Sequence, residues 1–349
     1  MKKFVIVLLC LGIWVGSAFA ASGADELYRQ GLEAYMAQDY GRAFEYFSGA
    51  AEEGNAVACA EIGRMYERGY GVEEDAGLAL EWFGRAFDGV KKSAEAGDVR
   101  AQFFLARMYY NGQAAELDRA LAAEWFLKAA DAGDMEAQNN LGVMYNLGEG
   151  VERDYARAAE LYREATEQGY MQAQYNLGVM YDRGEGVEQD YTRAAELYGK
   201  AAEQGYVQAQ YSLALMYYYG EGVERDYAQA AELFRKAAEQ GYMQALYNLG
   251  VMYYHGEGAE QDYAQAAELF RKAAEQGDAD AMYILGEMYY DGQGVEQDHD
   301  QAAELFRKAA DAGNNEAQIF LDEASKNLTK STKIKNDEGS IGNRQEVRK

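Results

Sequence analysis

The stretch from Tyr170 to Gly205, YMQAQYNLGVMYDRGEGVEQDYTRAAELYGKAAEQG, decides the fold, because edited copies of it fill most of the 349-residue chain. The copy that begins at Tyr242 is identical to it at 28 of 36 positions. The glycines that end successive copies are Gly54, Gly97, Gly133, Gly169, Gly205, Gly241, Gly277 and Gly313, and after Gly97 the step is always 36 residues. Repetition at a fixed period of this length predicts a solenoid, in which each repeat packs mainly on its neighbours.

Each copy has the pattern of two helices joined by a glycine-rich loop. Ala173, Leu177 and Met180 are spaced as one helical face that ends at Gly184. A second apolar stripe runs from Ala194 to Ala202 and ends at Gly205. Asp190 is expected to cap the second helix. We therefore predict an all-α chain of stacked helical hairpins, and we name the two helices of each hairpin helix A and helix B.

The pattern extends over nearly the whole chain. Residues 25–54 form a related hairpin with a shorter loop. The unit that ends at Gly97 is seven residues longer than the others, which is close to two helical turns and is expected to lengthen its helix B. Residues 314–326 are expected to form a capping helix, and residues 327–349, with few apolar side chains, a disordered tail.

The first 20 residues resemble a secretory signal peptide. Lys2 and Lys3 precede an apolar run from Phe4 to Val15, and Ala18-Phe19-Ala20 fits a cleavage site. No other stretch approaches the length of a membrane span. The sequence thus predicts an exported chain, periplasmic or extracellular, with no transmembrane segment after cleavage.

The predicted mature chain is strongly acidic. Without Lys2 and Lys3, 31 basic residues face 59 acidic ones, a net charge of −28. Such a field disfavours a nucleic acid partner and favours a basic protein or peptide. Cys59 is the one cysteine left after cleavage, so no internal disulfide is expected, and we expect this thiol to be buried.

The repeat resembles a known family. The pattern A-x-x-x-L-G-x-M-Y-x-x-G-x-G-V-x-x-D-Y-x-x-A-x-x-L-Y/F-x-K-A-A-x-x-G, carried here from Ala173 to Gly205, is similar to the Sel1-like repeat, a relative of the tetratricopeptide repeat. The resemblance covers seven units in residues 55–313, whereas residues 25–54 are more similar to a tetratricopeptide hairpin. It implies a right-handed αα-superhelix with helix A on the concave side, and roles as adaptor or scaffold in complex assembly, envelope signalling and host interaction. Ala114 departs from the pattern, because it replaces the second loop glycine of its unit.

No constellation for catalysis is found. His255 and His299 lie in different contexts with no further His or Cys at ligand spacing, so neither a metal nor a cofactor is expected. The nucleophile motif G-x-S-x-G is missing, and the acidic loop 182–190 lacks the ligand positions of a calcium loop. We expect a protein that is not an enzyme. The alternative is an envelope hydrolase acting on β-lactams or peptidoglycan, as described for a cysteine-rich branch of the family whose cysteines this chain lacks.

Helix A carries the candidate binding residues. Tyrosines recur two residues after the first alanine of the repeat pattern, which is Ala173 in the copy quoted above. Apolar residues follow one turn later, beside the stripe that builds the hairpin. The tyrosines either pack between repeats or line a binding groove, since aromatic side chains serve both purposes. The predicted concave-face residues are Tyr175, Asn176, Val179, Asp182, Tyr211, Ser212, Leu215, Tyr218, Tyr247, Asn248, Val251, Tyr254 and Tyr283. They predict a scaffold that binds a protein or peptide.

Overall fold

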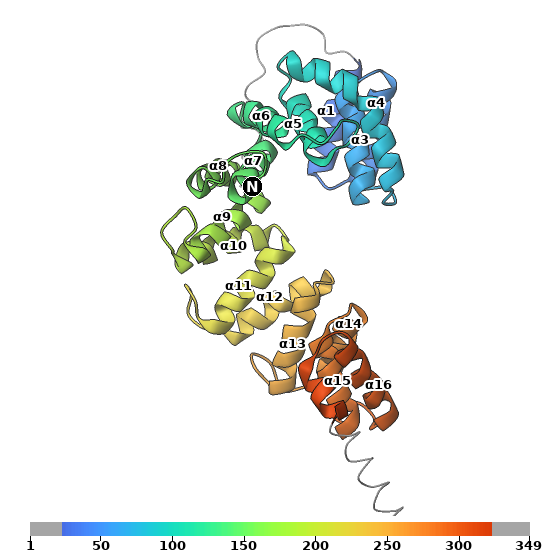
Figure 1. Ribbon diagram of the computed structural model, residues 1–349, viewed down its shortest axis with the longest axis vertical. Helices are drawn as coiled ribbons and strands as arrows, with labels where there is room; N and C mark the ends of the chain where they lie inside the picture. The colour runs from blue at the N-terminus through green and yellow to red at the C-terminus, as the bar shows by residue number, and fades with distance from the viewer. Residues whose placement is uncertain (1–22, 323–349) are drawn as a thin grey trace, which may run out of the picture. The chain divides into compact units, whose positions relative to one another are not determined.

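The computed structural model describes residues 23–322, and these residues form helical hairpins (Figure 1). The chain divides into two compact units, residues 1–165 and 166–349, which are described separately. The N-terminal unit holds α1 (Gly23–Met36), α2 (Tyr40–Glu52), α3 (Ala56–Arg68), α4 (Ala76–Glu95), α5 (Val99–Asn111), α6 (Arg119–Asp131), α7 (Met135–Leu147) and most of α8 (Tyr155–Glu167). The C-terminal unit holds α9 (Met171–Arg183), α10 (Tyr191–Glu203), α11 (Val207–Tyr219), α12 (Tyr227–Glu239), α13 (Met243–His255), α14 (Tyr263–Glu275), α15 (Ala279–Asp291) and α16 (His299–Asp311).

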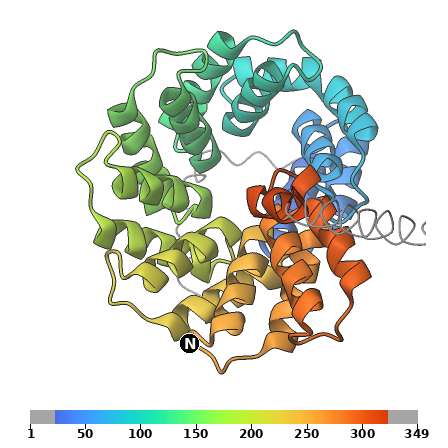
Figure 2. The ribbon, with the colours of Figure 1, turned by 60° about the horizontal axis from the view of Figure 1, so that its bottom comes forward.

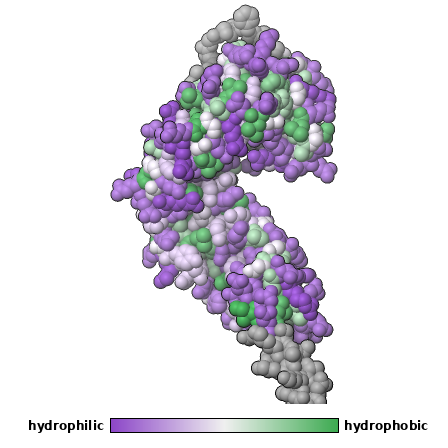
Figure 3. Space-filling view, in the orientation of Figure 1, coloured by the Kyte–Doolittle hydropathy of each residue, from purple (hydrophilic) through white to green (hydrophobic). Residues whose placement is uncertain are grey.

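The predicted all-α solenoid is confirmed, since the described residues contain helices and no strand. Odd-numbered helices are helix A and even-numbered helices are helix B of successive hairpins. Within each unit the hairpins pack side by side in chain order (Figure 2). Figure 3 shows that the visible surface is mostly hydrophilic, with small apolar patches between polar residues.

The helix ends lie where the sequence predicts them. Gly184 adopts a positive φ of 69° after α9, and its N–H donates to the carbonyl of Met180. The Asp190 carboxylate accepts a hydrogen bond of 3.0 Å from the N–H of Arg193 and so caps α10. These two signals therefore fix the length of the loop between helix A and helix B.

The second loop glycine lies at a close approach between repeats. A Cβ at Gly222, where φ is 69°, would lie 2.2 Å from the carbonyl oxygen of Tyr191, at the start of the preceding helix B. Ala114 holds the equivalent position in the N-terminal unit and keeps the same backbone conformation, with φ 60°. The loop geometry is thus retained at Ala114, where an L side chain makes it unfavourable.

The core of each hairpin is a ring of helix B packed on a small residue of helix A. Tyr198 of α10 covers Gly178 of α9 so closely that a Cβ there would come within 2.7 Å of the ring. Ala173, Leu177 and Met180 surround this contact and are buried, as predicted. The repeated glycine therefore exists because the ring occupies the place of a side chain.

The long unit has a long helix B. Helix α4 has 20 residues, against 13 in each other helix B from α2 to α16. Its added turns remain in phase, because Val90 and Ala94 are buried like Phe83 and Ala86. The prediction that the seven-residue insertion lengthens helix B is confirmed.

Glutamine clasps join neighbouring repeats of the C-terminal unit. Gln204 Nε2 donates to the carbonyl of Gly169 at 3.1 Å and to Gln174 Oε1 at 2.8 Å. Gln240 repeats both bonds one unit later, to Gly205 at 3.3 Å and to Gln210 Oε1 at 2.9 Å. The same junction is thus used twice in succession.

Several expectations concern residues outside the described range. The signal peptide (1–20) and the tail (327–349) lie there, as does the end of the capping helix, of which residues 315–322 are helical. Within residues 23–322, no helix combines the length and apolar character needed to cross a membrane.

Candidate functional site

One face of helix A carries most of the predicted binding residues. It consists of four positions spaced i, i+3, i+4 and i+7, and we call it the helix A face. In the C-terminal unit it comprises Gln172, Tyr175, Asn176 and Val179 on α9; Gln208, Tyr211, Ser212 and Leu215 on α11; Gln244, Tyr247, Asn248 and Val251 on α13; and Asp280, Tyr283, Ile284 and Glu287 on α15. All predicted binding residues lie on this face except Asp182, Tyr218 and Tyr254, which follow one turn later.

The tyrosines of the helix A face belong partly to the hairpin itself. Their rings pack against the ring of the adjacent helix B at centroid distances of 5.5 to 5.9 Å. The pairs are Tyr175 with Tyr198, Tyr211 with Phe234, Tyr247 with Phe270, and Tyr283 with Phe306. Each of the four tyrosines remains half-buried. One side of each ring therefore stabilises the hairpin, and the rest meets solvent.

Some of these side chains also join neighbouring repeats. Asn248 Nδ2 on α13 donates to the Tyr211 hydroxyl on α11 at 3.1 Å. The Tyr211 ring lies 5.1 Å from that of Tyr242, which precedes α13. Packing between repeats, one of the two roles considered for the tyrosines, is thus present at Tyr211.

The tyrosines one turn later reach the loop of the next repeat. Tyr218 donates to Glu257 Oε2 at 2.7 Å, and Tyr254 donates to Gln293 Oε1 at 2.9 Å. The bond to Glu257, with burial, raises the pKa of Tyr218 to about 12. Asp182 holds the same place on α9, where burial raises its carboxyl pKa. The hydroxyls of Tyr218 and Tyr254 therefore join one repeat to the next.

The remaining predicted residues, Asn176, Val179, Ser212, Leu215 and Val251, are half-buried. The structure thus brings the predicted residues together on neighbouring helices of one unit. Their role in partner binding stays a prediction.

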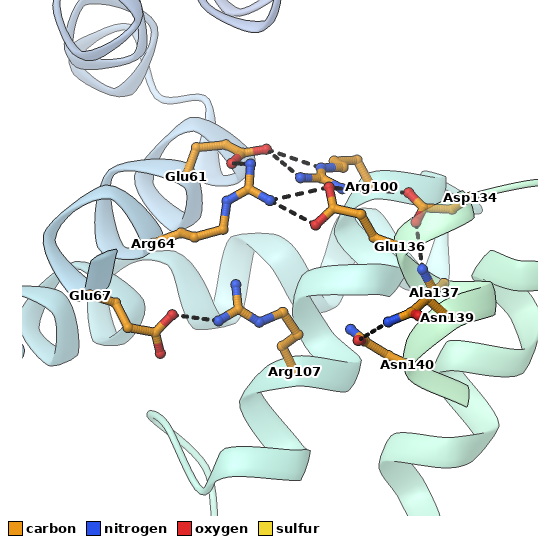
Figure 4. Close-up of polar contacts among 10 residues, drawn as sticks. All are labelled: Glu61, Arg64, Glu67, Arg100, Arg107, Asp134, Glu136, Ala137, Asn139 and Asn140. Atoms are coloured by element: carbon orange, nitrogen blue, oxygen red, sulfur yellow. Dashed lines mark hydrogen bonds and ion pairs between the residues drawn. The ribbon is translucent and has the colours of Figure 1, made fainter. Parts of the chain in front are cut away.

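The same face of the N-terminal unit carries a buried ionic network that sequence reasoning missed (Figure 4). Glu61 on α3 is fully buried and lies 2.6 Å from Arg64 Nη2 and 3.0 Å from Arg100 Nη2 on α5. Glu136 on α7 in turn lies 2.9 Å from Arg64 Nη1 and 2.8 Å from Arg100 Nη1. Asp134 completes the network at 3.6 Å from Arg100. Three successive hairpins are thus linked by one set of charges.

Aromatic rings enclose the two arginines of this network. The Arg64 guanidinium lies 4.7 Å from the centroid of Tyr35, and that of Arg100 lies 4.5 Å from Phe103 and 5.0 Å from Phe104. Such contacts favour a cation that has lost water. The rings therefore support the burial of both charges.

Burial and charge act in opposite directions on two acids at the start of α7, the N-cap Asp134 and Glu136. Burial alone would raise the pKa of Glu136, but Arg100 and Arg64 outweigh it and lower the pKa to about 2. For Asp134, burial prevails over the attraction of Arg100 and raises the pKa. Glu136 is therefore the acid that the network holds in its charged form.

A signal for this network exists in the sequence, but it is hidden by the insertion. Glu61 and Arg64 correspond to Asn176 and Val179 in the repeat pattern, and Arg100 to Gln172. The step between α3 and α5 is 43 residues and not 36, so alignment by the regular period misses the correspondence. Charged residues on a face that is neutral on α9, α11 and α13 would have indicated ion pairs.

Neither histidine nor cysteine forms a reactive cluster in the described part of the chain. His255 and His299 pack against Tyr254 and Tyr290, with ring centroids 5.2 and 4.8 Å apart. Cys59 is half-buried, less than expected, and burial raises its thiol pKa. Across residues 23–322, no group of three or more His, Cys, Asp or Glu side chains is placed to hold a metal ion.

The Sel1 repeat profile matches eight segments, residues 18–55, 56–89, 99–134, 136–170, 172–206, 207–242, 244–278 and 279–314. The chain belongs to the Sel1 repeat family. The first segment includes the hairpin that resembles a tetratricopeptide repeat. Sel1 repeats are protein-interaction modules.

Solved Sel1 structures share this fold. The protective antigen c5321 of uropathogenic Escherichia coli, which displays an SLR fold, is 40% identical with a TM-score of 0.67, covering 80% of this chain and 58% of its own. A Sel1 repeat protein of Oxalobacter formigenes is 32% identical with a TM-score of 0.61, covering 92% of this chain and 100% of its own.

A curated relative is more distant. HcpC of Helicobacter pylori, provisionally named a beta-lactamase, is 33% identical over 76 residues, which are 22% of this chain and 26% of HcpC. The chain therefore spans about a quarter of the curated relative and under two thirds of the E. coli antigen.

Proposed function

We propose that this Sel1 repeat protein is a non-catalytic scaffold that binds a protein or peptide on the helix A face of its C-terminal unit. The observation that carries the proposal is that the helices A of two successive hairpins, α11 and α13, contain no charged residue. Helices α11 (VQAQYSLALMYYY) and α13 (MQALYNLGVMYYH) contain no Asp, Glu, Lys or Arg, although 26% of the chain is charged. Depletion of charge with enrichment of aromatic residues is the compositional mark of a protein interface core.

The chemistry of the face fits polypeptide recognition. Half-exposed tyrosines offer large, rigid contact area, and Ser212 and Asn248 offer adaptable hydrogen bonds. Asp280 and Glu287 add negative charge on α15, within a chain of net charge −26. This charge supports a basic residue in the partner, beside a neutral segment.

Export to the envelope or beyond is part of the proposal. It is supported by the leader pattern from Met1 to Ala20, with its two lysines and apolar run. N-terminal sequencing of the protein from periplasmic and medium fractions tests it. A mature chain that begins near Ala21 is expected, and a chain that retains Lys2 and Lys3 contradicts it.

Site-specific photocrosslinking tests the binding face. A photoreactive residue at Ser212 or Leu215 on α11 is expected to give adducts in native envelope preparations, whereas one at Gln229, exposed on α12, is not. Ser212→Arg should abolish adduct formation at Leu215, because it places a charge in the neutral face. Gln229→Arg is the matched control. Equal adducts at all three positions would contradict the proposal.

A hydrolase is the second candidate, and the similarity to HcpC is what favours it. Turnover of nitrocefin or of muropeptides by the purified chain, lost on a single-residue change, would overturn the scaffold proposal. We expect no turnover, since the helix A face presents no nucleophile paired with a base.

A further inference from the structure

The helix A side of the N-terminal unit carries a pocket that shares no residue with the helix A face of the C-terminal unit. It has a volume of about 230 Å³. It is lined by Arg68, Arg107, Tyr110, Asn111, Phe126, Asn140 and Val143. A water molecule takes about 30 Å³ of liquid, and pockets for drug-sized ligands hold about 300–1,000 Å³. The pocket is therefore suited to one side chain of a partner.

The first arginine of the pocket retains donors for a ligand. Arg107 Nη2 binds Glu67 Oε2 at 2.5 Å, and Gln113 Nε2 donates to the other oxygen of Glu67 at 2.8 Å. Glu67 is held charged, since Arg107 and Gln113 outweigh its burial and lower its pKa. Glu67 thus fixes the guanidinium of Arg107 through one nitrogen, while Nε and Nη1 of Arg107 bind no residue in the described range.

The second arginine of the pocket, Arg68, is attracted by Glu67 but forms no salt bridge with it. Arg68 is exposed at the end of α3 and makes no ion pair with any residue in 23–322. Two guanidinium groups therefore line the pocket, and the carboxylate of Glu67 is paired with one of them, that of Arg107. The lining itself holds two arginines and no acidic residue, in a chain that is acidic overall.

Asn140 adds a further hydrogen-bond donor to the wall of the pocket. Asn140 accepts a hydrogen bond from Asn139 Nδ2 at 3.4 Å, so its own amide nitrogen is left to donate. Figure 4 shows Asn140 on α7 and Arg107 on the adjacent α5. The hydroxyl of Tyr110 donates to Glu149, and this bond fixes the tyrosine in the wall. A lining rich in donors calls for an acceptor, and a carboxylate matches guanidinium groups best.

We propose that this pocket binds the carboxylate of an acidic side chain, Asp or Glu, of a partner peptide. Phe126 and Val143 provide apolar surface for the methylene groups of that side chain. The inference rests on the proposed binding function. The pocket prefers an acidic side chain, whereas Asp280 and Glu287 on α15 favour a basic one. Its test uses only residues of the N-terminal unit, so the two proposals can fail separately.

The test is a titration of the full chain, labelled with ¹⁵N-arginine, by NMR. The probes are the peptide Ac-Gly-Glu-Gly-NH₂, its glutamine analogue, and glutarate as a free dicarboxylate. The glutamate peptide is expected to shift the Arg107 Nε signal and to bind at least ~10-fold more tightly than the glutamine peptide. Equal binding of the two peptides would overturn the proposal. Glutarate binding as tightly as the glutamate peptide would overturn a peptide as the source of the carboxylate.

Variants separate recognition from stability. Arg68→Gln, at an exposed side chain, should weaken binding of the glutamate peptide about 10-fold, since a charge-assisted hydrogen bond is lost. Glu67→Gln should tighten it several-fold, because Arg107 is then no longer shared with an internal carboxylate. Arg85→Gln removes one exposed arginine from α4 and is the matched control, with unchanged affinity. The proposal is wrong if Arg68→Gln and Glu67→Gln both bind like the wild type.

Discussion

Glu61 Oε2 lies 2.6 Å from Arg64 Nη2, in a pair whose side chains are 0% and 8% exposed. Glu61→Ala would remove one of the carboxylates that pair with the buried guanidinium groups of Arg64 and Arg100. We expect it to lower the free energy of unfolding by about 3–5 kcal/mol, the usual cost of breaking a buried ion pair. Urea unfolding followed by tryptophan fluorescence measures this, because Trp82 and Trp125 both lie in the N-terminal unit.

The control for Glu61 is Glu81→Ala on α4. Glu81 pairs with Arg85, and both side chains are more than half exposed. Its loss should cost less than about 1 kcal/mol, since exposed ion pairs contribute little. Equal effects of the two substitutions would show that the network does not stabilise the unit.

Stability of the N-terminal unit should fall in acid because of Glu136. Its pKa is about 2 in the fold, against about 4.3 in an unfolded chain. The folded pKa is the lower one, so the stabilisation is complete above about pH 5 and is lost as the pH falls toward 2. The difference corresponds to roughly 3 kcal/mol. Thermal unfolding of wild type and Glu136→Gln between pH 7 and 2 should converge at the acid end. Parallel curves would contradict this role.

Ala114→Gly should stabilise the loop between α5 and α6. Ala114 holds a φ of 60°, a conformation that costs an L residue about 1–2 kcal/mol and glycine nothing in steric terms. We expect the free energy of unfolding to rise by about 1 kcal/mol. This net value is smaller than the strain removed, because glycine has more freedom in the unfolded chain. The melting temperature reported by tryptophan fluorescence measures it. The reverse change, Gly150→Ala in the next loop, should destabilise by more, because its Cβ would also lie 2.3 Å from the carbonyl oxygen of Arg119, and a gain there would refute the argument.

Asp182→Tyr should create a missing link between repeats. Tyr110, Tyr218 and Tyr254 each donate to the residue 39 positions later, which at Asp182 would be Glu221. The loop already suits a tyrosine, since Gln189 binds the Asp182 carbonyl at 2.8 Å just as Gln261 binds that of Tyr254. We expect a gain of about 1 kcal/mol, the value of one hydrogen bond.

Circular dichroism of thermal unfolding measures this gain, with Asp182→Asn as the control that removes only the charge. Adding Glu221→Ala to Asp182→Tyr should cancel the gain in a double-mutant cycle. A gain that persists without Glu221 would mean that the ring, and not the hydrogen bond, stabilises the junction.

Local signals in the sequence are sufficient for the hairpins but not for the ionic network. Gly184 and Asp190 mark helix ends through bonds to residues three or four positions away, so the chain order alone places them. Arg64 and Glu136 are separated by 72 residues, and their contact depends on how three hairpins stack. The double role of Tyr211, with one side on Phe234 and its hydroxyl on Asn248, likewise depends on packing that a period cannot specify.

The glutamine clasps bear on how the gene can change. Gln204 and Gln240 each donate to the last glycine of the preceding repeat, so loss or gain of one 36-residue segment by recombination would rejoin matching surfaces. The N-terminal unit is different, because removal of the hairpin of α3, α5 or α7 would take part of the ionic network away. We therefore expect repeats to be gained or lost more readily in the part of the gene that encodes the C-terminal unit than in the part that encodes the network.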